Sequence, residues 1–155
     1  MAMANSQLPV PLPTGGWGRS RSAAPFFPAA RHAGRPMPSL LVMVCWVQAI
    51  YFLATGVWPL VSIGTFMAVT GPKRDVWLVR TVGVIVAVVG GVLAMAAGRG
   101  AISAEVATLA VGSAAALAAV DVFYVANRTI PKIYLLDAAA EAVLIAAWGV
   151  AWFGP

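Results

Sequence analysis

Two carboxylates, Asp137 and Glu141, lie four residues apart in the apolar stretch YLLDAAAEAVL at 134–144. On a helix, residues at this spacing lie on one face. Carboxyl groups in apolar surroundings can bind a proton, neutralise a cation, or exchange protons with a substrate as general acid and base. The chemistry therefore depends on which helices surround these two acids and which group neutralises them.

The composition indicates a membrane protein. Of the 155 residues, 61% are hydrophobic and 10% are charged, and the mean hydropathy is +0.89. Soluble domains carry about a quarter charged residues, so this chain is far too apolar for one.

The charge and the metal-binding residue types exclude several kinds of function. The net charge is +5, but no basic face interleaved with aromatic residues is visible, so we expect no nucleic-acid partner. The chain has one cysteine and one histidine. We therefore expect no zinc site, no haem and no other cofactor.

Four apolar segments have the length of about 20 residues that crosses a bilayer. They span 39–58, 76–97, 103–126 and 132–153. The connections between the last three segments are short, so these segments should be antiparallel neighbours. The first connection, 59–75, is longer, and we expect a short interfacial helix in it at 63–69.

The predicted fold is therefore all-α, a bundle of four transmembrane helices over 39–155. The preceding 38 residues are rich in Pro and Arg, which is typical of a disordered tail. Met37 is an alternative start to Met1.

An even number of spans places both ends of the bundle on one side of the membrane, which we call side A; side B holds the first and third connections. Side B is the more basic near the membrane. Its basic residues are Lys73, Arg74, Arg80, Arg128 and Lys132. Basic loops stay in the cytoplasm, so the basic residues of side B favour an orientation with both termini outside. The four arginines of the tail lie on side A and nearly cancel this charge difference.

Polar residues at membrane depth occur in all four segments. With a rise of about 1.5 Å per residue, Arg80 and Asp121 lie about 7 to 9 Å from side B, Asp137 about 9 Å, and Glu141 and Gln48 about 15 to 16 Å. A charge at this depth costs several kcal/mol, so it should face the bundle interior and pair.

The helical faces predict one cleft open to side B. Arg80 shares a face with the small residues Gly83, Ala87 and Gly91, so we expect it to point inward. The residues expected to form the ligand- or proton-binding cleft are Gln48, Arg80, Asp121, Asp137 and Glu141, with Tyr51, Tyr124 and Tyr134. Other aromatic residues, Trp148 and Trp152 among them, are expected in interfacial belts.

Two interpretations of the cleft remain open. Arg80 could neutralise Asp121 or Asp137 in an ion pair that only fixes the packing. Three acids against one arginine nevertheless leave at least one acid without a basic partner, and we expect Glu141 to be such an acid. It must then be protonated, hydrated, or paired with a group from another molecule.

These observations support three functional hypotheses. The first is a binding or transport-accessory protein whose cleft holds a proton, a cation or a small amphipathic molecule. The second is an accessory subunit of a larger membrane complex, in which the excess acid meets a basic residue of a partner. The third, an intramembrane enzyme acting on lipid or isoprenoid, is disfavoured because no nucleophile, metal-ligand or cofactor motif accompanies the acids. The expected partners are the lipid bilayer and a second copy of the chain or another membrane protein.

Two stretches carry a resemblance to a known family. VTGPKRDVWLVRTVG at 69–83 and DVFYVANRTIPKIYLLDAAAE at 121–141 resemble small uncharacterised bacterial integral membrane proteins with four predicted spans. The resemblance covers about residues 40–150 and implies a four-span fold in a bacterial inner membrane. The topology is also similar to that of DoxX-like proteins, an analogy that transfers no functional residue.

Overall fold

A computed structural model describes residues 39–154, and this part of the chain is helical without strands. The helices are α1 (Ser39–Val61), α2 (Ile63–Thr70), α3 (Val76–Gly98), α4 (Ala104–Ala126) and α5 (Tyr134–Phe153). The predicted tail, 1–38, lies outside the described residues. Four of the helices, α1, α3, α4 and α5, are long and apolar enough to cross a membrane, so the predicted class of a multi-pass helical membrane protein is confirmed.

The helix bounds agree with the expected segments to within three residues. α1 continues through Pro59 to Val61, and a break at Ser62 separates it from α2. The short helix expected after the first segment is confirmed by α2. α4 begins where the Oγ of Ser103 accepts a hydrogen bond from the Val106 N–H at 3.4 Å, which satisfies one of the free donors at the helix start.

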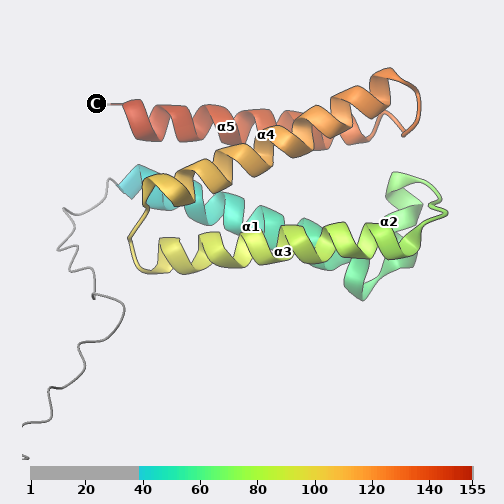
Figure 1. The fold of residues 1–155 in the computed structure, drawn as a ribbon, viewed down its shortest axis with the longest axis horizontal. Helices are drawn as coiled ribbons and strands as arrows, with labels where there is room; N and C mark the ends of the chain where they lie inside the picture. Colours follow the sequence, from blue (N-terminus) through green and yellow to red (C-terminus); the bar gives the residue numbers. More distant parts are fainter. Residues whose placement is uncertain (1–38, 155) are drawn as a thin grey trace, which may run out of the picture. The chain divides into compact units, whose positions relative to one another are not determined.

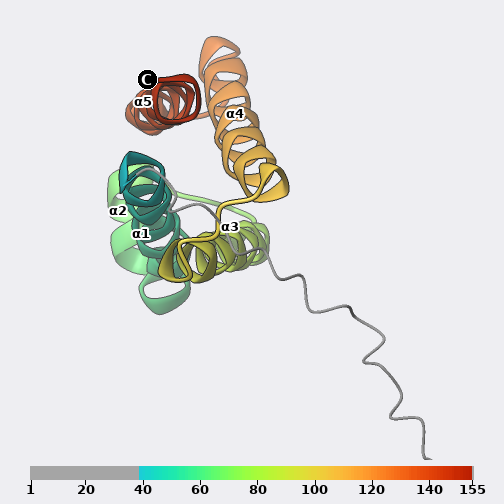
Figure 2. The ribbon, with the colours of Figure 1, turned by 90° about the vertical axis from the view of Figure 1, so that its left-hand side faces the viewer.

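The spanning helices pack as two antiparallel pairs. α1 lies along α3 and α4 lies along α5, and the two pairs meet mainly where α1 contacts α5 (Figures 1 and 2). Contact between α3 and α4 is small. In the end-on view of Figure 2, α3 lies diagonally across from α5, so side chains of α3 are remote from those of α5.

The α1–α3 contact depends on glycine. A Cβ added to Gly56 would lie 2.6 Å from the carbonyl oxygen of Gly83 and 2.7 Å from the Ala87 backbone nitrogen. One added to Gly90 would lie 3.0 Å from the Phe52 Cβ. The two backbones therefore touch, as small residues in membrane helices permit. The expected small-residue face is present, but Gly90 continues it instead of Gly91, which has open space beside it.

The apolar core fills the side A half of the bundle, which is the left-hand end in Figure 1. It is built from the first turns of α1, the last turns of α3 and α5, and the start of α4. Its buried members are Leu41, Val44, Cys45, Ala49, Leu93, Ala97, Ile102, Ala110, Trp148 and Ala151. Apart from Glu105 in the first turn of α4, the charged residues within the spans lie in the side B half.

Candidate functional site

Three acids of two neighbouring helices come together in the side B half. Asp121 belongs to α4, and Asp137 and Glu141 belong to α5; their carboxyl groups are close enough for their charges to interact. We call these residues the carboxyl cluster. From the side B ends of their helices, Asp137 lies about 5 Å deep, Asp121 about 8 Å and Glu141 about 10 Å.

Tyr51 of α1 completes the group. Its hydroxyl donates a hydrogen bond to Oδ1 of Asp137, and its ring lies within range of the charges of Asp121 and Glu141. Asp137 is partly exposed, and its carboxyl adjoins that of Asp121 within hydrogen-bonding reach. The partner of Asp137 is therefore a tyrosine and not the expected arginine.

Two carboxyl oxygens of the cluster accept no hydrogen bond from the part of the chain that the structure describes. They are Oδ2 of Asp121 and Oε2 of Glu141, and both are buried. The side chains of Asp121 and Glu141 are only 7% and 1% exposed. No basic side chain of residues 39–154 is among the groups whose charge acts on these two acids. An ionised carboxylate in this position would bear the full cost of an unpaired buried charge.

The expected inward position of Arg80 is wrong, because its side chain is exposed. The helical face was correctly identified, but it faces α1 and not the acids. A Cβ on Gly83 would lie 3.0 Å from Pro59, so α3 meets the last residues of α1 at this point. Arg80 lies one turn closer to side B, level with the last residues of α1, and its side chain is exposed there. Its long side chain can there reach the membrane surface.

Gln48 was expected at the floor of the cleft, and the structure places it as a link between three helices. Its Nε2 donates to the Ala110 carbonyl of α4 at 2.8 Å. Its Oε1 accepts from Nε1 of Trp148 of α5 at 2.6 Å. Gln48 is fully buried, so these bonds satisfy a polar group that would otherwise be costly.

The expected position of Trp148 in an interfacial aromatic belt is also wrong. Its side chain is only 1% exposed and lies in the core. Its position seven residues after Glu141 puts it on the same face of α5 as that acid. This spacing was the signal that could have placed it inside the bundle.

The two remaining tyrosines lie outside the cluster. Tyr124 is 43% exposed and makes an edge-on contact with Phe123. The ring of Tyr134 lies beneath Nζ of Lys73, which is 4.8 Å from the ring centroid. Of the eight residues proposed for the cleft, the structure thus brings together Tyr51 and the three acids of the carboxyl cluster. Gln48 lies one turn before Tyr51 on α1 and bonds to α4 and α5.

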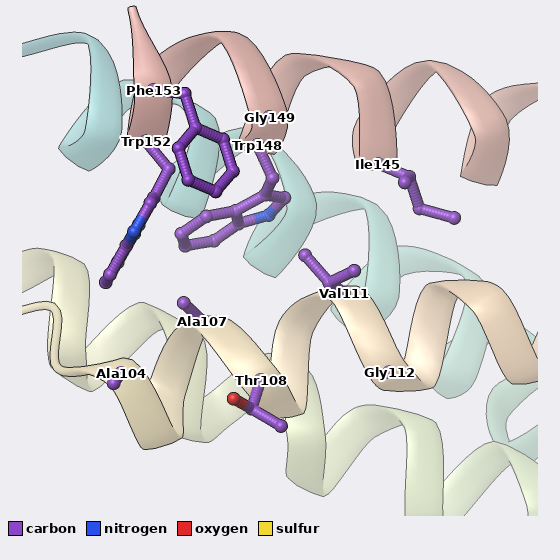
Figure 3. Close-up of a pocket in the computed structure, with 10 residues that line it drawn as sticks. All are labelled: Ala104, Ala107, Thr108, Val111, Gly112, Ile145, Trp148, Gly149, Trp152 and Phe153. Carbon is purple, nitrogen blue, oxygen red and sulfur yellow. The ribbon is translucent and has the colours of Figure 1, made fainter.

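A separate groove lies between α4 and α5 toward side A (Figure 3), with a volume of about 570 Å³. Its lining is mostly apolar, with Val111 and Ile145 toward one end and Phe153 at the other, and the indole of Trp148 faces into it. None of the three acids lines it.

The geometry limits what the carboxyl cluster can bind. Within residues 39–154, no three Asp, Glu, His or Cys side chains are arranged to hold a metal ion. The unpaired oxygens of Asp121 and Glu141 are each suited to a single proton, which would turn a costly carboxylate into a neutral carboxyl group. Comparison of the chain with protein-family models, with curated proteins and with solved structures finds no match. The resemblance noted in the sequence therefore gains no support, and the assignment of the site depends on its geometry alone.

Proposed function

We propose that this membrane protein binds protons at the carboxyl cluster, in a binding or transport-accessory role. One observation carries the proposal: Oδ2 of Asp121 and Oε2 of Glu141 are buried and accept no hydrogen bond from any donor of residues 39–154. Neutralisation is required because a buried, unpaired charge costs several kcal/mol. A proton is the smallest group that provides it.

The burial of Glu141 favours a proton over the larger occupants considered from the sequence. Its side chain is 1% exposed, so an amphipathic molecule could reach it only if the helices separated. The same holds for a basic side chain of a partner subunit, which was the alternative hypothesis. Asp137, which is partly exposed, already accepts the Tyr51 hydroxyl.

The test is a titration of protonated carboxyl groups in the full chain reconstituted in lipid nanodiscs. Infrared difference spectroscopy detects the C=O stretch of a protonated carboxyl, which disappears when the group ionises. We expect a band that persists at neutral pH and is diminished in Glu141→Gln and in Asp121→Asn. Matched controls are Glu105→Gln and Asp75→Asn, because both of these acids are exposed.

Two results would count against proton binding. If the wild type shows no protonated carboxyl at neutral pH, the acids are ionised and must be neutralised in another way. If the protein co-purifies with a stoichiometric partner and the band appears only after the partner is removed, the accessory-subunit alternative is favoured.

We also propose a bacterial inner membrane location with side B in the cytoplasm. The support is the distribution of charge: Arg74, Arg80, Arg128 and Lys132 are exposed at side B, whereas Arg99 is the one basic residue at side A within 39–154. Basic residues close to span ends are retained in the cytoplasm. In a Cys45→Ala background, an impermeant maleimide should label Ala101→Cys from outside intact cells and leave Arg128→Cys unlabelled; the reverse pattern would invert the orientation.

A further inference from the structure

We infer that the carboxyl cluster exchanges protons with the aqueous phase on side B alone, while the side A half of the bundle acts as a seal. This inference rests on the proposed proton binding and adds the side of the membrane from which protons reach the cluster. It would make the protein responsive to the pH of one compartment only.

The cluster becomes progressively more enclosed away from side B. Asp137 is nearest to that surface and partly exposed, Asp121 is 7% exposed, and the deepest acid, Glu141, is 1% exposed. Asp137 and Asp121 adjoin each other, and the charges of both act on Glu141. A proton that reaches Asp137 from water therefore meets the adjoining carboxyl of Asp121, and Glu141 lies deeper, within range of the charges of both.

The groups that face the cluster come from every helix packed around it. α1 contributes Tyr51, whose hydroxyl is bonded to Asp137. α4 and α5 contribute the acids themselves. At the surface, Lys73 lies over the ring of Tyr134, three residues before Asp137. α3 contributes nothing, because its one ionisable residue within the span, Arg80, is exposed.

Toward side A, no acidic or basic side chain of residues 39–154 lies between the cluster and the exposed Glu105 and Arg99 at the helix ends. Two polar side chains come first, and both are engaged. The Ser113 hydroxyl donates to the Leu109 and Ala110 carbonyls, and the Gln48 amide is bonded to the Ala110 carbonyl and to Trp148. Beyond them lie the core, in which Cys45 and Leu93 are 0% exposed, and the groove between α4 and α5, whose lining includes no acidic or basic side chain. The Cys45 thiol itself is bonded to the Leu93 carbonyl at 3.3 Å.

The thickness of this barrier follows from the helix bounds. From Glu141 to the end of α5 at Phe153 there are 12 further residues, or about 18 Å of helix without an ionisable side chain. A proton that crosses such an apolar layer without a carboxyl, a histidine or water pays the cost of a charge inside a bilayer. The Gln48–Trp148 bond lies within this apolar layer, since Trp148 is seven residues beyond Glu141 on α5.

The test uses proteoliposomes of the full chain with a C-terminal tag, separated on an affinity resin into vesicles with side A outward, which bind, and vesicles with side B outward, which do not. A rapid step in the external pH is followed through the carboxyl C=O band. We expect the full response of the cluster in the side B-outward vesicles and none in the side A-outward vesicles before the internal pH changes.

Two variants assign the signals. Glu141→Gln should reduce the response in the side B-outward vesicles. Glu105 is exposed in the first turn of α4, at side A, so its own carboxyl must respond in the side A-outward vesicles and Glu105→Gln must remove that response. This shows that the step reaches side A of the protein.

The outcomes separate the two proposals. A cluster response to the side A step, alone or together with side B, overturns the one-sided access and leaves proton binding intact. A cluster that responds from neither side, while Glu105 responds normally, overturns proton binding and its direction together.

Discussion

Replacement of Gly56 by alanine tests the packing that positions the site. Gly56 lies where α1 touches α3, and an added Cβ would lie 2.6 Å from the Gly83 carbonyl oxygen and 2.7 Å from the Ala87 nitrogen. Both are backbone atoms, which cannot rotate away as a side chain can. Ordinary contacts begin at 3.4 Å, so α1 and α3 must separate by about 0.8 Å at this level.

The expected cost follows from comparison with a second glycine. Overpacking of this kind costs about 1–3 kcal/mol, whereas a change from glycine to alanine within a helix contributes about 1 kcal/mol in favour. Gly91 is the matched control, because a Cβ added there meets nothing within 4 Å. Since both variants share the helix-propensity contribution, the difference in their free energies of unfolding isolates the steric cost of about 1–3 kcal/mol.

The assay is reversible unfolding in mixed micelles with an increasing fraction of sodium dodecyl sulfate, followed by circular dichroism. Gly56→Ala should unfold at a lower detergent fraction than the wild type, and Gly91→Ala at the same or a higher one. Equal midpoints for the two variants would refute the close contact between α1 and α3. Because Tyr51 lies five residues before Gly56 on the same helix, Gly56→Ala should also disturb the contact of Tyr51 with Asp137.

Three further predictions concern the site itself. Tyr51→Phe removes the donor to Asp137 and should lower the free energy of unfolding by about 1–3 kcal/mol, while the exposed Tyr124→Phe should change it little; equal effects would contradict the hydrogen bond. Trp148→Phe removes the donor to the Gln48 amide and should destabilise by a similar amount of about 1–3 kcal/mol, against an exposed control, Trp152→Phe. Arg80→Gln should change the free energy of unfolding by no more than about 0.5 kcal/mol and should leave the carboxyl band unchanged, since Arg80 is exposed. A large shift of the band would instead support an ion pair between Arg80 and the acids.

The half of the bundle in which the acids lie could be predicted from the sequence, but their partners could not. Helical rise alone places Asp121, Asp137 and Glu141 in the side B half, because depth depends only on position along a helix. A partner depends on which helices are neighbours. The face of α3 that carries Arg80 packs against α1 and not against the acids, and the arginine side chain is exposed near the end of that helix.

The position of Trp148 shows a related limit. A tryptophan near the end of a span is typical of an interfacial belt, and the local sequence offers only its seven-residue spacing from Glu141 as a sign that it faces the core. The core position of Trp148 depends on Gln48, 100 residues earlier in the chain, whose side-chain oxygen accepts the hydrogen bond of the indole N–H. Pairs this remote in sequence become neighbours only through the packing of the helices.

The sequence by itself therefore determined the class of the protein, the four spans, the short helix between the first two, and the presence of more buried acid than buried base. These follow from composition, segment length and helical rise, which are local properties of the chain. Only the tertiary structure decided that no basic side chain of residues 39–154 faces Asp121 and Glu141, that Tyr51 takes the place expected for Arg80, and that Gln48 and Trp148 close the side A half. Those outcomes depend on which helix faces meet, and the glycine contact that joins α1 to α3 directs Arg80 away from the acids.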